Sequence, residues 1–78
     1  MDKPTMALEI AEELARMVEF VPNSYGYPIT VESQNRMAGY LEETLGDKVG
    51  NGAFAGIDMS KRTAYCFVDG EYAEVKCA

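Results

Sequence analysis

The side chains of this sequence that could take part in a reaction are paired carboxylates, two thiols and a few serines. Glu12 and Glu13, like Glu42 and Glu43, are neighbours in the chain. Neighbours on a helix project about 100° apart, so neither pair converges on one substrate. The chain contains no histidine, which removes the commonest general base and excludes Ser-His-Asp and Cys-His sites. We therefore expect a protein that is not an enzyme.

The cysteines and glycines do not form a recognisable ligand site. Cys66 and Cys77 are eleven positions apart with no histidine nearby, which matches no usual zinc spacing. Gly46, Gly50 and Gly52 lack the Lys-Ser/Thr ending of a nucleotide-binding loop. We expect no metal and no cofactor, and two reduced cysteines in the core; the alternative for Cys77 is an intermolecular disulfide.

The charge balance points to the class of partner. The 78 residues carry 13 acidic and 7 basic groups, a net charge of −6. Direct binding to nucleic acid normally needs a basic face, so we expect none. Acidity favours a protein partner with a basic surface; the alternative is that it serves solubility alone. Neither a signal peptide nor an apolar run long enough for a membrane span is apparent, which predicts one cytoplasmic domain over residues 1–78.

Two helices are predicted in the first part of the chain. Apolar residues at helical spacing predict a first helix over residues 5–21, with Thr5 as its N-cap and Pro22 as its stop. A second helix is predicted over residues 31–45, with Thr30 as its N-cap. The residues predicted to form its buried apolar stripe are Val31, Met37, Ala38, Leu41 and Leu45. Gly39 lies inside it, which suggests either close approach of another backbone or a bend. The glycine-rich residues 47–52 are predicted to form a mobile connector.

The last 26 residues predict an antiparallel sheet. Asp69-Gly70 between two strand-like runs favours a two-residue type I′ turn, which places Phe67 opposite Tyr72. A third strand over residues 53–59 places Phe54 opposite Phe67. The expected fold class is α+β: two helices followed by a three-stranded antiparallel β-meander (ααβββ), with the helices on one face of the sheet.

This register gives the sheet two unlike faces. Small apolar residues occupy the face predicted to lie under the helices: Ala53, Ala55, Ile57, Ala64, Cys66, Val68, Ala73, Val75 and Cys77. Aromatic residues occupy the other: Phe54, Tyr65, Phe67 and Tyr72. An apolar patch of several hundred Å² on a small protein usually marks an interaction site. A slip of one residue would exchange the two faces.

We therefore expect a non-enzymatic protein-binding module. Its sharpest form is a small acidic inhibitor that docks on a basic, nucleic-acid-handling protein, as phage or mobile-element inhibitors of host defence do. The candidate partner-binding residues are Phe54, Tyr65, Phe67, Tyr72, Tyr25, Tyr27, Glu9, Glu12, Glu13, Glu42 and Glu43. One alternative is a structural homodimer or assembly subunit that associates through the aromatic face. Another is a ligand pocket between the loop of Tyr25 and Tyr27 and the glycine-rich connector.

Overall fold

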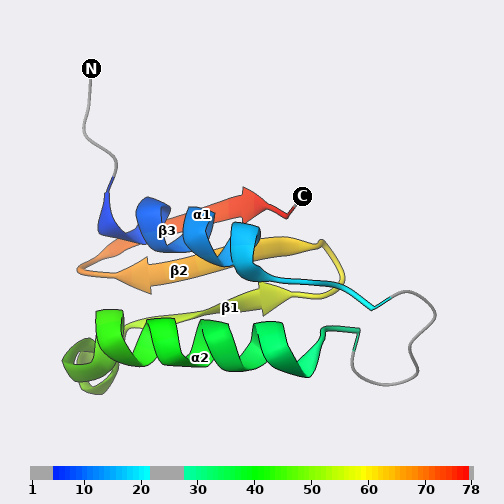
Figure 1. Cartoon of the computed structure of the whole chain (residues 1–78). Helices are drawn as coiled ribbons and strands as arrows, with labels where there is room; N and C mark the ends of the chain where they lie inside the picture. Colours follow the sequence, from blue (N-terminus) through cyan, green and yellow to red (C-terminus); the bar gives the residue numbers. More distant parts are fainter. Residues whose placement is uncertain (1–4, 22–27, 78) are drawn as a thin grey trace.

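The computed structural model describes residues 5–21 and 28–77 and confirms the predicted fold class. Two helices precede a three-stranded antiparallel sheet of strand order β1-β2-β3 (Figure 1). The elements are α1 (Met6–Met17), α2 (Val31–Leu45), a 3-10 helix η1 (Gly46–Asn51), β1 (Phe54–Asp58), β2 (Thr63–Val68) and β3 (Glu71–Lys76). No helix among the described residues is both long and apolar enough to cross a membrane.

Helix α1 begins as predicted but ends four residues early. The Thr5 side chain accepts a hydrogen bond from the Leu8 backbone N–H and caps the helix. The backbone leaves the helical region at Val18. Hydrogen bonds then tie residues 19–21 to residues 28–30, including Val21 N–H to the Pro28 carbonyl. Pairing with this second segment therefore outcompetes the last helical turn that the apolar spacing predicted.

Helix α2 has the predicted bounds, but its buried face differs from the prediction. Met37 and Leu45 are buried, whereas Val31 is 65% exposed and Ala38 is also exposed, so both were wrongly assigned to the buried stripe. Ser33 is fully buried instead and hydrogen-bonds to the Thr30 hydroxyl. Hydrogen bonding to the helix cap thus lets a polar residue occupy a core position.

The glycine positions correct two further predictions. A Cβ atom added at Gly39 would meet nothing within 4 Å, so close approach of another backbone does not explain this glycine. The predicted mobile connector is largely the 3-10 helix η1, which ends at Gly52 with a φ of 93°.

An ion pair connects η1 to the sheet. The Lys48 side chain reaches across to Asp69, with 3.1 Å between Nζ and Oδ1. This ion pair ties η1 to the β2–β3 turn.

The sheet has the predicted register. Phe54 pairs with Phe67, and Phe67 pairs with Tyr72. Asp69 and Gly70 both have positive φ, 53° and 79°, as a type I′ turn requires. The predicted faces are therefore confirmed, because the alternation of side chains along paired strands follows from the register.

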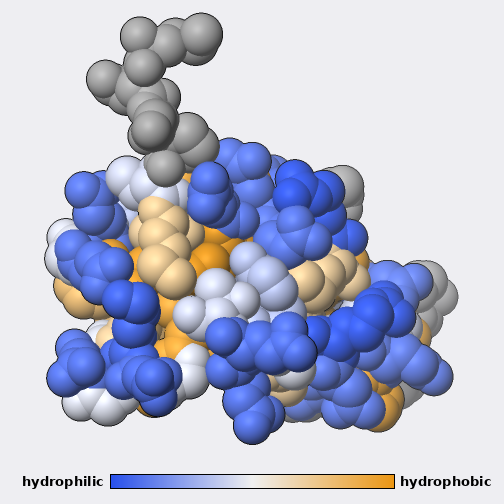
Figure 2. Space-filling view, turned by 60° about the vertical axis from the view of Figure 1, so that its left-hand side comes forward, coloured by the Kyte–Doolittle hydropathy of each residue, from blue (hydrophilic) through white to orange (hydrophobic). Residues whose placement is uncertain are grey.

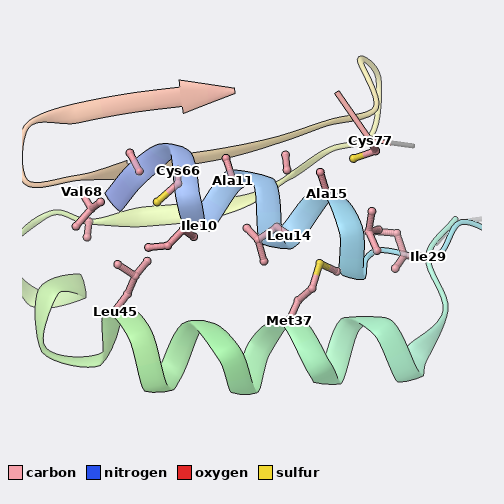
Figure 3. Packing of buried hydrophobic residues seen from close by; sticks show 14 residues of the cluster. Ile10, Ala11, Leu14, Ala15, Ile29, Met37, Leu45, Cys66, Val68 and Cys77 are labelled. Atoms are coloured by element: carbon pink, nitrogen blue, oxygen red, sulfur yellow. The ribbon is translucent and has the colours of Figure 1, made fainter. Parts of the chain in front are cut away.

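The core lies between the sheet and α1, with α2 closing one side. Helix α1 contacts all three strands, and its alanines at 7, 11 and 15 are buried together with Ile10 and Leu14. Helix α2 runs alongside β1 (Figure 1). Met37 and Leu45 point from α2 toward α1 in the core (Figure 3). Small side chains at three successive α1 turns let that helix lie close to the sheet, which leaves the opposite sheet face bare.

Candidate functional site: the aromatic sheet face

The sheet face that points away from the helices presents three cross-strand rows. We call this surface the aromatic face. Its first row is Phe54, Phe67 and Tyr72; its second is Gly56, Tyr65 and Glu74; its third is Asp58, Thr63 and Lys76. The face is thus aromatic at one end of the strands and polar at the other. The structure brings together all four aromatic residues that the sequence predicted as partner-binding on the sheet.

The rings of the aromatic face pack against one another rather than under the helices. Phe54 stacks on Phe67 with ring centroids 5.4 Å apart, and it meets Tyr65 at 6.1 Å in a tilted arrangement. Phe54 remains 51% exposed and Tyr72 remains 53% exposed. Such mutual packing holds the rings in place, so the face is a preformed surface with little side-chain entropy to lose on contact.

Two polar details fix the orientation of the tyrosines. The Tyr72 hydroxyl donates a hydrogen bond of 2.7 Å to Oε1 of Glu74, and this bond raises the pKa of Tyr72 to about 12. The Tyr65 hydroxyl lies over Gly56, 2.8 Å from the position that a Cβ atom would take there. Glycine therefore makes room for the Tyr65 ring to lie over the neighbouring strand, and a glycine opposite an aromatic residue is a stabilising pair in sheets.

The predicted acidic residues fall into two groups. Glu9, Glu12 and Glu13 belong to α1, which packs on the opposite side of the sheet from the rings. Glu13 forms an ion pair with Arg16 on the same helix. These three carboxylates and the aromatic face cannot contact one flat partner surface together.

The second acidic group lies at the aromatic end of the molecule. Figure 1 shows the C-terminal end of α2, η1, the start of β1 and the β2–β3 turn at the same end. Five carboxylates lie in these segments: Glu42, Glu43, Asp47, Asp69 and Glu71. All five residues are exposed. Figure 2 brings this end forward and shows hydrophilic residues around strips of apolar surface. We call these five residues the acidic rim.

The charge of the chain is concentrated in the helical part. Acidic groups outnumber basic ones eight to three over residues 5–52, and four to three over residues 53–77. The three basic side chains of the helical part, Arg16, Arg36 and Lys48, each form an ion pair. Arg36 pairs with Glu19, which lies outside its own helix. Among the described residues, Glu42, Glu43 and Asp47 therefore have no basic partner of their own.

The potentially reactive groups are embedded in the core. Cys66 and Cys77 are free and buried, in agreement with the prediction of reduced core residues. Burial raises the pKa of both thiols, which lowers the thiolate fraction at neutral pH. Over residues 5–21 and 28–77, no cluster of three histidine, cysteine, aspartate or glutamate residues is placed to hold a metal ion.

Sequence reasoning missed one apolar groove. A space of about 220 Å³ lies between α2 and β1 and is lined by apolar side chains that include Met37, Leu41 and Ile57. It results from the loose fit of α2, which the helical periodicity alone did not indicate. Tyr25 and Tyr27, two of the predicted contact residues, lie outside the residues that the structure describes. The ligand pocket predicted beside them therefore also falls outside the described residues.

Comparisons with known proteins give no relative for this chain: no protein-family model, no curated protein and no solved structure matches it.

Proposed function

We propose that this protein is a non-enzymatic protein-binding module that acts as a small acidic inhibitor of a basic, nucleic-acid-handling partner in the cytoplasm. The observation that supports this most strongly is the exposed aromatic row at the same end of the molecule as the acidic rim. A partner that covers this end would bury Phe54 and Tyr72 and face Glu42, Glu43 and Asp47.

The aromatic row would supply the affinity. Tyrosine and other large rings are enriched among the few residues that dominate binding energy. Phe54 and Tyr72 each leave about half of their surface in water. Covering that surface would contribute about 1–2 kcal/mol for each ring, at roughly 25 cal/mol per Å². Because Phe54 is already stacked on Phe67 and the Tyr72 hydroxyl is already hydrogen-bonded to Glu74, little ordering cost offsets this gain.

The acidic rim would select the partner and speed its arrival. Lys48, the basic residue in the same segments, is neutralised by Asp69, so the rim carries a net negative field. Complementary charge raises association rates and disfavours acidic partners. A nucleic-acid-binding groove is basic, and clustered carboxylates can occupy it in place of phosphates. We propose that the protein acts as phage or mobile-element inhibitors of host defence do, by occupying the nucleic-acid-binding surface of its partner.

The test begins with capture of a partner by the immobilised protein from cells that express it, followed by mass spectrometry. The captured protein is purified, and its affinity for the chain is measured at low and high salt. We expect a basic nucleic-acid-binding protein whose binding weakens by at least tenfold between about 50 and 200 mM salt, as contacts between opposite charges do. A short DNA or RNA duplex should compete with the chain for the partner.

Two matched variants separate the rim from the rest of the acidic surface. Glu42→Lys with Glu43→Lys should reduce affinity at least tenfold, because it reverses two charges of the rim. Glu9→Lys with Glu12→Lys changes the net charge by the same amount on α1 and should have a much smaller effect. Equal affinities for both double variants and the unmodified chain would exclude the electrostatic proposal.

A further inference from the structure

The aromatic face is self-complementary when a twofold axis runs parallel to β2. Rotation about such an axis exchanges the positions of β1 and β3 while each row stays opposite itself. The first row then places Phe54 against the second copy's Tyr72, and Phe67 against its own counterpart. The cross-strand register fixes these pairings, because residues of β1 and β3 in one row lie on opposite sides of β2.

The polar rows match under the same rotation. Asp58 of one copy faces Lys76 of the other, so the third row forms two ion pairs related by symmetry. In the second row Glu74 faces Gly56, over which the Tyr65 hydroxyl lies. That hydroxyl is a donor and the carboxylate is an acceptor. A twofold interface requires that each contact occur twice with its partners exchanged, and all three rows meet this condition.

The other simple twofold arrangement does not match. An axis across the strands would place the aromatic row of one copy over the polar row of the other. Phe54 would then face Asp58, and Tyr72 would face Lys76. Apolar rings would cover charged groups without giving them partners, which costs free energy. The charge pattern of the face therefore favours the axis along β2.

We propose that the partner of the aromatic face in the isolated protein is a second copy of the chain, packed face to face with a twofold axis close to parallel with β2. This inference rests on the proposed role of the aromatic face in binding, but not on the identity of the basic partner. The two sheets would pack in the aligned class, about 10 Å apart, with the strand directions within roughly 30° of one another.

The size of the face sets the strength of the dimer. Three strands spaced about 4.8 Å apart and five or six residues of about 3.3 Å each define a face of only a few hundred Å². A stable interface usually buries about 800 Å² on each partner. The dimer is therefore weak, with a dissociation constant in the micromolar range or above, and a tighter-binding basic partner displaces the second copy from Phe54 and Tyr72.

Charge exchange between copies tests the register. Sedimentation equilibrium should show association of the unmodified chain in the micromolar range. Asp58→Lys places two lysines opposite each other in its own dimer, and Lys76→Glu places two carboxylates opposite each other. Each variant alone should be monomeric, with association weakened at least tenfold. An equal mixture of the two variants should associate again, because the mixed dimer places opposite charges against each other at both ion-pair positions of the third row.

In that mixed dimer, the lysine introduced by Asp58→Lys on one copy faces the glutamate introduced by Lys76→Glu on the other. This contact is attractive, as the original pair is, with the two charges exchanged. The remaining contact of the third row joins the unmodified Lys76 of the first copy to the unmodified Asp58 of the second. Both ion pairs of the row are therefore restored in the mixture and in neither variant alone.

Further variants control for folding and for net charge. Asp58 also accepts a hydrogen bond from the Lys61 backbone N–H, so Asp58→Asn, which keeps an acceptor there, replaces Asp58→Lys if the latter fails to fold. It should weaken association severalfold. Lys61→Glu changes the net charge as Lys76→Glu does, but from the loop outside the three rows, and should leave association unchanged. Tyr72→Ser should abolish it.

These experiments test the dimer independently of the proposed binding to a basic partner. A chain that remains monomeric to millimolar concentration would overturn the inference and leave the proposed inhibitor function standing. Association that is insensitive to Lys76→Glu and Asp58→Asn would also overturn it, since another surface would then be responsible. Conversely, Glu42→Lys with Glu43→Lys should weaken binding to the basic partner at least tenfold and leave the dimer intact.

Discussion

The two faces of one three-stranded sheet differ in what covers them. The inner face carries Ala64, Cys66 and Val68, whose exposure is 1% or less, and α1 packs closely upon it. The outer face carries rings that pack only on one another, with Phe54 and Tyr72 half in water. Placing small side chains on one face of a sheet and large ones on the other thus decides which face a helix can cover. Small side chains admit the helix, and large ones remain as a surface for other molecules.

The largest predicted difference between the faces lies in their contribution to folding. Leu14→Ala, which shortens a fully buried α1 side chain in the core between that helix and the sheet, should cost about 3 kcal/mol of unfolding free energy. Phe54→Ala removes a larger side chain from the bare face, yet should cost less than about 1 kcal/mol, as partly exposed positions usually do. Denaturant unfolding at low protein concentration measures both changes.

A milder core substitution can replace Leu14→Ala if that variant does not fold. Ile10→Val, at another buried site, should cost about 1 kcal/mol. If Phe54→Ala cost as much as Leu14→Ala, the rings would be part of the folding core, and the distinction between the two faces would be lost.

The sequence was sufficient to predict the sheet because its signals are local. Asp69-Gly70 specifies a turn with two residues of positive φ, and period-two alternation then assigns every strand residue to a face. The same reasoning predicted the aromatic face. It did not predict the end of α1, because the pairing of Phe20 with Ile29 depends on a second segment whose position no local pattern specifies.

Helix α2 shows the same limit on the prediction of side-chain environments. Periodicity placed Val31 and Ala38 in the core, but α2 lies beside β1 rather than over the sheet, so a narrower stripe than expected is buried. The acidic rim was only half predicted for a related reason. Glu42 and Glu43 were recognised as a cluster, but their nearness to Asp69 and Glu71 depends on how η1 returns the chain to the sheet.

Gly56 tests whether the rings of the bare face are a packed surface. A Cβ atom at this position would lie 2.8 Å from the Tyr65 hydroxyl oxygen and 3.1 Å from the ring carbon that bears it. Gly56→Ala should therefore displace the ring and cost about 1 kcal/mol. In a Tyr65→Ser background the same substitution should be neutral or stabilising, a coupling of at least about 0.5 kcal/mol. Additive effects would show that Tyr65 does not rest on Gly56.

Gly39 tests how tightly the helical layer is packed away from the sheet. It is exposed within α2, and an added Cβ atom would meet no neighbour within 4 Å. Gly39→Ala should stabilise the protein by somewhat less than about 1 kcal/mol, because alanine favours helix and glycine does not. Gly52→Ala is the matched control and should destabilise, since Gly52 has a φ of 93°. Thermal unfolding of both variants would show opposite shifts.

The pKa values of Cys66 on the inner face and Tyr72 on the bare face are raised by different causes. Burial beneath the helices raises the pKa of Cys66, whereas on the bare face the hydrogen bond to Glu74 raises the pKa of Tyr72 to about 12. Glu74→Gln removes the carboxylate acceptor that stabilises the protonated phenol. The pKa of Tyr72 should therefore fall toward about 10, its ordinary value.

Ring carbon resonances followed by NMR as the pH is raised should show this difference. The Tyr72 resonances should stay constant to about pH 11 in the unmodified chain, and in Glu74→Gln they should begin to shift at lower pH. The thiol of Cys66 should react slowly in both proteins, because its protection comes from burial that the substitution does not touch. An unchanged Tyr72 titration in Glu74→Gln would mean that burial also governs the bare face, and the contrast between the two faces would fail on this measure.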